Sequence, residues 1–398
     1  MSAKFTIPMS SPDLTEAERQ AVSAVLQTPY LSMGRELEAF EAAFCSFTGS
    51  RSAIGVNSGT AGLHLCVRAA GITEGDIVIT TPFSFVSSTN VLLFERAVPI
   101  FVDVEATTGN INVDQVNQAV KDITSGGNAA ENWLPSSVTS DGARLKAILV
   151  VDVFGQPSDM DPILKIAEEH NLKVIEDSCE ALGAEYKGRK AGTLGDFGVF
   201  GFYPNKQITT GEGGVIVTSD DRAASIMLAL RNQGRAPGDT WLEHSYLGYN
   251  YRLDEMSAAL GRVQLTRLDE MLAKRSRVAT WYENRLFEIP EVETPQVEKS
   301  TSRMSWFVYV IRLTPAVDRD YVVSELEKRG IPARPYFAPI HLQRYMVERF
   351  GYKEGDYPVT EDLGHRSLAL PFSGVMKETQ VDFVCSAIKE IMHQKGCN

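Results

Sequence analysis

Short runs of apolar residues alternate with helical patterns along the first part of the chain. The runs are "SAIGV", "DIVITTPFSF", "VPIFVDV", "KAILVVDVFG" and "LKVIEDS". Between them lie segments with helical spacing such as "DMDPILKIAEEHN". The N-terminal "SPDLTEAERQAVSAVLQ" has Ser or Asp before a Glu-rich first turn, which predicts a capped amphipathic helix. Near-continuous apolar strands separated by helices are typical of a mainly parallel sheet covered on both faces, and they predict an α/β domain.

The pattern changes after about residue 250. A long helical stretch, from Leu253 to Phe287, would carry the chain from the first domain to a second. The strand "SWFVYVIRL" and the helices "DRDYVVSELEKRG" and "KETQVDFVCSAIKEIMHQ" follow it. We therefore predict a large domain over residues 1–250, including a short N-terminal segment, and a smaller α+β domain over residues 251–398. Residues 123–144 are polar and rich in Gly and Ser, and we expect a mobile excursion there.

Composition narrows the class of protein. With 398 residues, 43% of them hydrophobic and 23% charged, the chain is typical of ordinary globular proteins. A net charge of −12 argues against nonspecific binding of nucleic acid. No apolar run reaches the roughly 18 residues of a membrane span, and no signal peptide is predicted. The five cysteines lack metal-type spacing, which predicts reduced thiols, no metal site and a cytoplasmic protein.

A turn between a predicted strand and a predicted helix holds the first candidate binding group. The turn is "NSGTAG", in which Gly59, Thr60 and Ala61 could offer backbone N–H groups and a hydroxyl to a phosphate at the helix N-terminus. An ordinary strand-to-helix turn is the commoner explanation of such a segment. The turn matches neither the dinucleotide-binding fingerprint nor the P-loop.

Two consecutive carboxylates, Glu176 and Asp177, end a buried-looking strand. One interpretation is a helix N-cap. The other is a carboxylate that meets the ring nitrogen of a heteroaromatic cofactor and keeps it protonated. Phe83 or Phe85 could stack on such a ring, although core packing is the commoner role of a strand Phe. Lys206 stands between an aromatic strand and a glycine-rich turn and would bind an aldehyde, so the combination predicts a pyridoxal phosphate site.

The chain closely resembles the DegT/StrS family of nucleotide-sugar aminotransferases, within the fold type I superfamily of pyridoxal-phosphate enzymes. The resemblance covers nearly the whole chain, including "VIEDSCEALGAEYKGRKAGTLGDFGVFGFYPNKQITTGEGGVIVT", "GYNYRLDEMSAALG" and "PYFAPIHLQ". It implies that Lys206 forms the Schiff base with pyridoxal phosphate, that Asp177 is the partner of the pyridine nitrogen, and that Phe85 stacks on the ring. Gly59 and Thr60 resemble the phosphate cradle of the family.

Other matched positions concern the neighbouring subunit and the substrate. Asn250 resembles the residue that reaches the phosphate from the partner, which implies a homodimer with shared active sites. His341 resembles a residue of the substrate-side wall. The same blocks of sequence assign Tyr336 and Arg252 to the substrate side.

Two positions depart from the common pattern of the family. Gly201 stands where many members have a Ser whose hydroxyl binds the cofactor phosphate, so the resemblance does not carry this phosphate contact over to the chain. Glu180 stands where many members have His or Gln close to the ring hydroxyl. A carboxylate at this position resembles the perosamine-synthase branch, which aminates C4 of a 4-keto-6-deoxy sugar.

The resemblance implies an aminotransferase that moves an amino group from glutamate to a keto group of a nucleotide-linked sugar, with pyridoxamine phosphate as the intermediate form of the cofactor. A 3-dehydratase of the same family is disfavoured, because it carries His in place of the lysine at position 206. A noncatalytic regulator that binds the cofactor is disfavoured because the lysine, the acid and the stacking ring are all present. An aminotransferase for a non-nucleotide ketone, such as a cyclitol, stays open.

Overall fold

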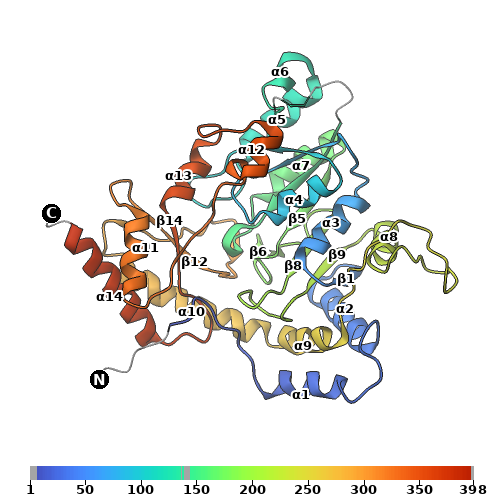
Figure 1. The fold of residues 1–398 in the computed structure, drawn as a ribbon, viewed down its shortest axis with the longest axis horizontal. Helices are drawn as coiled ribbons and strands as arrows, with labels where there is room; N and C mark the ends of the chain where they lie inside the picture. Colours follow the sequence, from blue (N-terminus) through green and yellow to red (C-terminus); the bar gives the residue numbers. More distant parts are fainter. Residues whose placement is uncertain (1–6, 136, 139–143, 396–398) are drawn as a thin grey trace.

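The computed structural model describes residues 7–135, 137–138 and 144–395. Its central element is a seven-stranded sheet (Figure 1). The strands are β1 (Ser52–Val56), β2 (Ile77–Thr80), β3 (Val98–Phe101), β4 (Leu145–Val151), β5 (Lys173–Asp177), β8 (Phe197–Gly201) and β9 (Gly214–Thr218). They lie in the order β1-β9-β8-β5-β4-β2-β3, and within this sheet β9 alone is antiparallel to its neighbours.

Helices pack on both faces of this sheet (Figure 1). Side chains alternate between the faces along each strand, so Leu149 faces one helical layer while Ile148 and Val150 face the other. The first layer contains α3 (Gly59–Ala69), α4 (Ser87–Phe94) and α8 (Asp221–Arg231); the second contains α2 (Arg35–Thr48), α5 (Val113–Ser125), α7 (Met160–His170) and α9 (Glu255–Thr266). The predicted sheet with two covered faces is confirmed.

A second sheet is built from the C-terminal part of the chain. Its antiparallel strands are β10 (Val292–Glu293), β12 (Tyr309–Leu313), β14 (Ser367–Leu370) and β13 (Arg334–Pro335), in that order. Its apolar side packs on α10 (Leu268–Leu286), α11 (Arg319–Lys328) and α14 (Glu378–Lys395). This arrangement agrees with the predicted α+β character of the C-terminal region.

The remaining elements are shorter helices, turns and strands. They are α1 (Glu16–Val25), α6 (Gly127–Glu131), α12 (Arg344–Phe350) and α13 (Pro358–Arg366), the 3-10 turns η1 (Val153–Gly155) and η2 (Ile340–Leu342), and the small sheet of β11 (Thr301–Arg303), β6 (Glu185–Tyr186) and β7 (Arg189–Lys190).

Two local expectations differ from the structure. The long helical stretch after residue 250 is two helices, because Arg267 lies between the end of α9 and the start of α10. The first helix is capped by Thr15, which forms a capping box with Glu18, and not by the earlier Ser or Asp. Residues 123–131 are mostly helical, since α5 continues to Ser125 and α6 follows; that residues 123–144 form a mobile excursion stays a prediction. Residues 136 and 139–143 of that segment lie outside the described residues.

The domain boundary at residue 250 stays a prediction. Residues from each side of it pack in the core of the other part. Ile7 packs in the apolar core of the C-terminal sheet. Met346 and Phe350 pack in the core of the large sheet.

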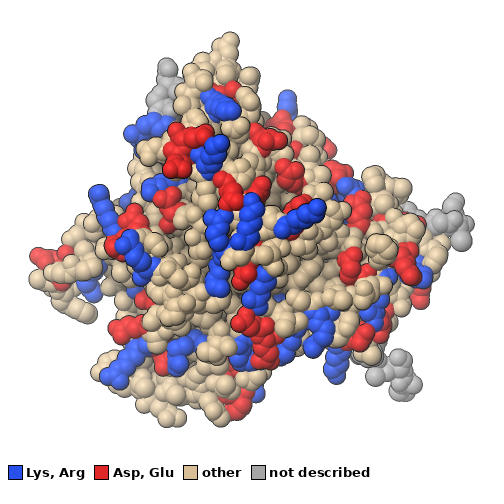
Figure 2. Space-filling view, turned by 180° about the vertical axis from the view of Figure 1, so that it is seen from behind, with Lys and Arg blue, Asp and Glu red and all other residues tan. Residues whose placement is uncertain are grey.

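Charges of both signs are mixed on the face seen from behind, where Lys and Arg alternate with Asp and Glu (Figure 2). That face therefore has no broad field of one sign. Among the helices of the described residues, none combines the length and apolarity that a bilayer span requires.

Candidate active site

A cavity of about 600 Å³ opens at the carboxyl edge of the parallel strands. Asp177 ends β5, Gly201 ends β8, and Gly59 and Thr60 begin the helix that follows β1. The carboxyl ends of parallel strands meet at one edge of a sheet, and this is where α/β proteins bind ligands. Of the residues predicted from the sequence, the walls contain Gly59, Thr60, Phe85, Asp177, Glu180, Lys206 and Tyr336.

The amine of Lys206 lies between a carboxylate and an aromatic ring. The residue stands on the turn between β8 and β9, where its N–H donates to the carbonyl oxygen of Tyr203 at 2.9 Å. Its Nζ is 3.6 Å from Oε1 of Glu180 and 3.8 Å from the centre of the Phe307 ring. The side chain is 14% exposed and lines the cavity. This amine is therefore held in place and remains accessible from the cavity.

The two consecutive carboxylates at the end of β5 have different surroundings. Glu176 is buried and accepts hydrogen bonds from the backbone N–H groups of Gly192, Leu194 and Gly195, at 2.9, 2.6 and 2.6 Å. Asp177 lines the cavity and accepts from the N–H of Cys179 at 3.2 Å. The residues after Asp177 form turns and not a helix, so the interpretation as a helix N-cap is wrong.

Burial controls the acidity of the cavity carboxylates. It raises the pKa of Asp177, and hydrogen bonds from Cys179 and the charge of Lys206 oppose that rise. Burial also raises the pKa of Glu180. The charge of Lys206 and a hydrogen bond from the N–H of Phe154, 2.9 Å from Oε2, oppose that rise. Both carboxylates are therefore coupled to the lysine charge, and removing that charge would favour their neutral forms.

The start of α3 offers donors for an anion. A helix leaves its first backbone N–H groups without partners inside the helix. Ser58 caps α3 by accepting from the N–H of Ala61 at 3.1 Å, so Ala61 is not a free donor, contrary to the prediction. The N–H groups of Gly59 and Thr60 remain for an anion. The Thr60 hydroxyl also lies beside the cavity, 2.9 Å from Oγ of Ser87.

Glycine at two positions lets this end of the cavity close tightly around Cys179. A Cβ atom on Gly59 would lie 2.7 Å from the Cys179 sulfur, which is closer than packed atoms approach. A Cβ on Gly201 would lie 3.3 Å from both Cβ and Sγ of Cys179. The thiol thus fills space beside Gly201, the position that carries Ser in many members of the resembling family.

The two candidate stacking rings, Phe83 and Phe85, differ clearly in their exposure. Phe83 is 1% exposed and packs edge-on against Phe154 and Phe337 in the core. Phe85 is 63% exposed and lines the cavity. Only Phe85 of this pair is placed to cover a ring bound there.

The remaining predicted residues do not all meet at this cavity. The Arg252 guanidinium donates to Oδ1 of Asn232 at 3.1 Å, and Asn250 is exposed; neither lines the cavity within this chain. His341 is fully buried, and its Nε2 lies 2.9 Å from Oε1 of Glu361. The prediction that His341 lies in the wall of this cavity is therefore wrong, because its turn, η2, directs the ring into the protein.

Several lining residues were not singled out from the sequence. Phe307 lies in a segment interpreted only as a strand, Cys179 directly precedes Glu180, and Tyr203 precedes Lys206 by three positions. Ser87 follows Phe85 by two positions. The signal for Cys179, Tyr203 and Ser87 was their closeness in sequence to Asp177, Lys206 and Phe85.

The donor set fits pyridoxal phosphate. A lysine amine, a buried carboxylate, an exposed aromatic face and a helix N-terminus with two hydroxyls all face one cavity. Gly59 and Gly201 add no side chain of their own at that N-terminus, where Cys179 already packs closely. Among the described residues, no group of three or more His, Cys, Asp or Glu side chains could hold a metal ion.

Comparisons with known proteins agree over almost the whole length. The model of the DegT/DnrJ/EryC1/StrS aminotransferase family matches residues 12–389. The GDP-perosamine synthase of Caulobacter vibrioides is 36% identical over 395 residues, covering 98% of this chain and 100% of that protein. The GDP-perosamine synthase of Escherichia coli O157:H7 is 33% identical over 390 residues, covering 98% and 99%.

The fold is also found among solved structures. PseC of Helicobacter pylori, an aminotransferase involved in the biosynthesis of pseudoaminic acid, superposes with a TM-score of 0.86 at 27% identity, covering 98% of this chain and 100% of that chain. The fold type I architecture and the family resemblance seen in the sequence are confirmed. The chain therefore belongs to the DegT/DnrJ/EryC1/StrS aminotransferase family and is a pyridoxal-phosphate-dependent enzyme related to sugar aminotransferases.

Proposed function

We propose that this enzyme transfers the amino group of glutamate to the keto carbon of a nucleotide-linked sugar, a 4-keto-6-deoxy sugar. The observation that carries the proposal is the Lys206 amine, which stands beside Glu180 in a cavity of about 600 Å³. Relatives at 36% and 33% identity are named GDP-perosamine synthases, which supports the choice of substrate class. Glu180 occupies the position at which this chain resembles that branch.

Each part of the cavity has a proposed task. The cofactor, when bound, supplies the aldehyde that accepts the amino group and a ring that takes up electrons. The N–H groups of Gly59 and Thr60 would hold its phosphate. Phe85 would cover one face of its ring. The ionised carboxylate of Asp177 would hold a proton on the ring nitrogen, which a neutral residue could not do.

The amine of Lys206 would move the proton between the two carbons that exchange it. A single group fixed above both positions shortens the transfer and removes the entropy cost of recruiting a second base. Glu180 is close enough to act on the charge of this amine, since 3.6 Å separates Oε1 from Nζ. The buried surroundings strengthen that interaction relative to water.

A second copy of the chain would complete the site. Phe85 and Tyr203 line the cavity yet are 63% and 55% exposed, which is unusual for large apolar side chains. Asn250 is exposed as well, so its amide is free to reach a neighbour. We propose that a partner subunit covers this rim and that Asn250 of each subunit contacts the phosphate in the other.

Mixing two inactive variants tests the shared site. Lys206→Ala chains combined with chains carrying Asn250→Ala should regain about a quarter to a half of wild-type activity, because one site per mixed dimer receives both intact residues. Mass spectrometry verifies that mixed dimers form, and each variant alone is the control. Mixed dimers without regained activity would place Asn250 in the site of its own subunit or outside the site.

A panel of half-reactions tests the substrate class. Glutamate alone should convert the bound pyridoxal phosphate to its amino form, with loss of the visible absorbance. Nucleotide-linked 4-keto-6-deoxy sugars should then restore that absorbance, whereas cyclitol ketones should not. Restoration by cyclitol ketones alone would favour an aminotransferase for a non-nucleotide ketone.

A further inference from the structure

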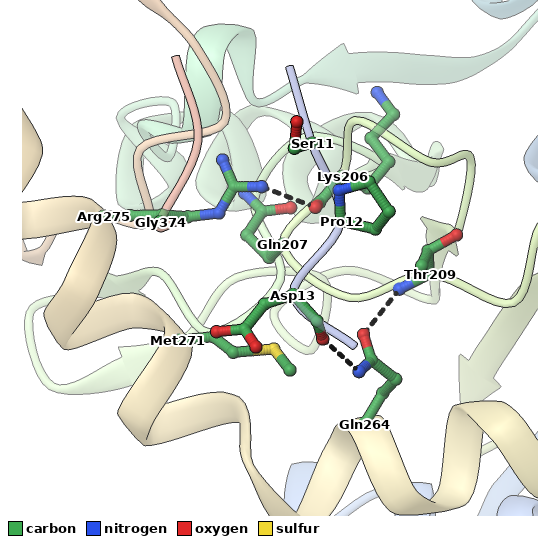
Figure 3. A pocket seen from close by; sticks show the side chains of 10 residues that line it. All are labelled: Ser11, Pro12, Asp13, Lys206, Gln207, Thr209, Gln264, Met271, Arg275 and Gly374. Atoms are coloured by element: carbon green, nitrogen blue, oxygen red, sulfur yellow. Dashed lines mark hydrogen bonds between the residues drawn. The ribbon is translucent and has the colours of Figure 1, made fainter. Parts of the chain in front are cut away.

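A buried arginine supports the backbone of Lys206 from the side opposite the cavity. Arg275, in α10, is 4% exposed. Its Nη2 donates to the carbonyl oxygens of Asn205 and Lys206 at 3.2 and 2.6 Å, and its Nη1 to those of Trp306 and Phe307 at 3.1 Å each. Figure 3 shows the bond to the Lys206 carbonyl, with the Lys206 side chain leading away from the guanidinium.

The charge of Arg275 is compensated by backbone dipoles. No ion pair to its guanidinium occurs among the residues that the structure describes. Burial lowers the pKa of Arg275 to about 10, with the charge of Asp13 opposing, so the group stays charged at neutral pH. Burying a charge without an ionised partner costs free energy, and the four carbonyl bonds are what offsets it here.

The space beside Arg275 is too small for a ligand. The space beside Arg275, also lined by Asp13, Gln264 and Met271, has a volume of only about 10 Å³ (Figure 3). Such a space holds at most about one water molecule. The guanidinium therefore acts on the two backbone segments that it joins.

Those two segments bear the two partners of one contact in the active site. The first segment bears Lys206, and the second bears Phe307, whose ring centre is 3.8 Å from the lysine Nζ. The second segment is also linked to Glu180, because the Phe307 N–H donates to the carbonyl of Phe154 at 3.3 Å and the Phe154 N–H donates to Glu180. One side chain thus fixes the amine relative to its aromatic and acidic neighbours.

We propose that Arg275 is a positioning residue that holds the Lys206 amine in register with Phe307 and Glu180. The proposal rests on the proposed catalytic role of Lys206. It is independent of which ketone the enzyme accepts.

Three variants test the proposal. Arg275→Met removes the charge at similar length, and Arg275→Lys keeps the charge but reaches fewer carbonyls. Arg312→Met is the matched control, because Arg312 in β12 also donates to two backbone carbonyls, those of Ala106 and Thr107, away from the lysine.

Arg275→Met should alter the site itself. In the cofactor-free protein, hydrogen exchange at the amides of residues 203–207 should accelerate. The Kd of pyridoxal phosphate should rise about tenfold, and the visible circular dichroism of the bound cofactor should change. The kcat of the glutamate half-reaction should fall about a hundredfold with little change in KM, since small misplacements cost that much. Arg275→Lys should give values of these quantities between those of the wild type and Arg275→Met. Arg312→Met should lower only the Tm.

A purely structural role predicts a different outcome. If Arg275→Met and Arg312→Met lose the same Tm while Arg275→Met keeps the wild-type circular dichroism, Kd and kcat, the proposal is overturned. If Arg275→Met does not fold, Arg275→Lys decides by the same readouts. These measurements need no sugar, so they stay readable even if every nucleotide-linked ketone is rejected.

Discussion

Replacing Lys206 by Ala should abolish transamination, with a loss beyond about 10⁴-fold, because the amine serves both covalent binding and proton transfer. The folded state should survive, since the side chain lines the cavity and the backbone hydrogen bonds of Lys206, to Tyr203 and Arg275, do not depend on it. Visible absorbance and the glutamate half-reaction measure the chemistry, and far-ultraviolet circular dichroism measures the fold.

Two controls sharpen this expectation. Lys206→Arg keeps a cation over the Phe307 ring but has no amine that can join an aldehyde, so it should be as inactive as the alanine variant. Lys190→Ala removes another lysine that lies over an aromatic ring, Phe47, outside the cavity, and should leave the reaction unchanged. Full activity in Lys206→Ala would end the proposed mechanism.

Changing Asp177 to Asn should lower the rate about a hundredfold or more, because the amide keeps the shape but loses the charge that holds the ring proton, and a group of this kind controls several pKa units. The cofactor should still bind, because the phosphate donors are unchanged. Steady-state kcat and cofactor affinity are the measurements.

The neighbouring carboxylate provides a matched comparison. Burial raises the pKa of Glu176, and its hydrogen bonds from three backbone N–H groups oppose that rise. Glu176→Gln should therefore weaken the loop at residues 192–195 and lower the Tm while leaving kcat near the wild-type value. If Asp177→Asn keeps the wild-type rate, Asp177 serves only to accept the N–H of Cys179.

The sequence predicted the large sheet because its strands are buried on both faces and read as continuous apolar runs, such as "KAILVVDVFG". It also predicted that Asp177 and Lys206 would belong to one site, because their combination and the family resemblance assign both to the same cofactor. It could not show that Glu176 and Asp177 have separate tasks, because that depends on which loop packs against each side of the strand end.

Other features depend on contacts between distant parts of the chain. Arg275 lies in the polar-looking "LAKRSRVAT", and only the fold brings Asn205 and Phe307 to its guanidinium. His341 sits in a short turn whose direction is set by its pairing with Glu361. No Gly or Pro marks the end of the helix at Arg267 in the sequence. Arg267 forms ion pairs there with Asp13 and Glu18, residues far away in sequence.

The second half-reaction, followed with ¹⁵N-labelled glutamate, tests the central proposal most directly. Enzyme first converted with the labelled donor and freed of it is mixed with a nucleotide-linked 4-keto-6-deoxy sugar, and mass spectrometry reads the product. The account predicts an amino sugar that carries the label, formed by the wild-type enzyme and not by Lys206→Ala. A wild-type enzyme that passes its label to a cyclitol ketone but to none of the nucleotide-linked sugars would contradict it.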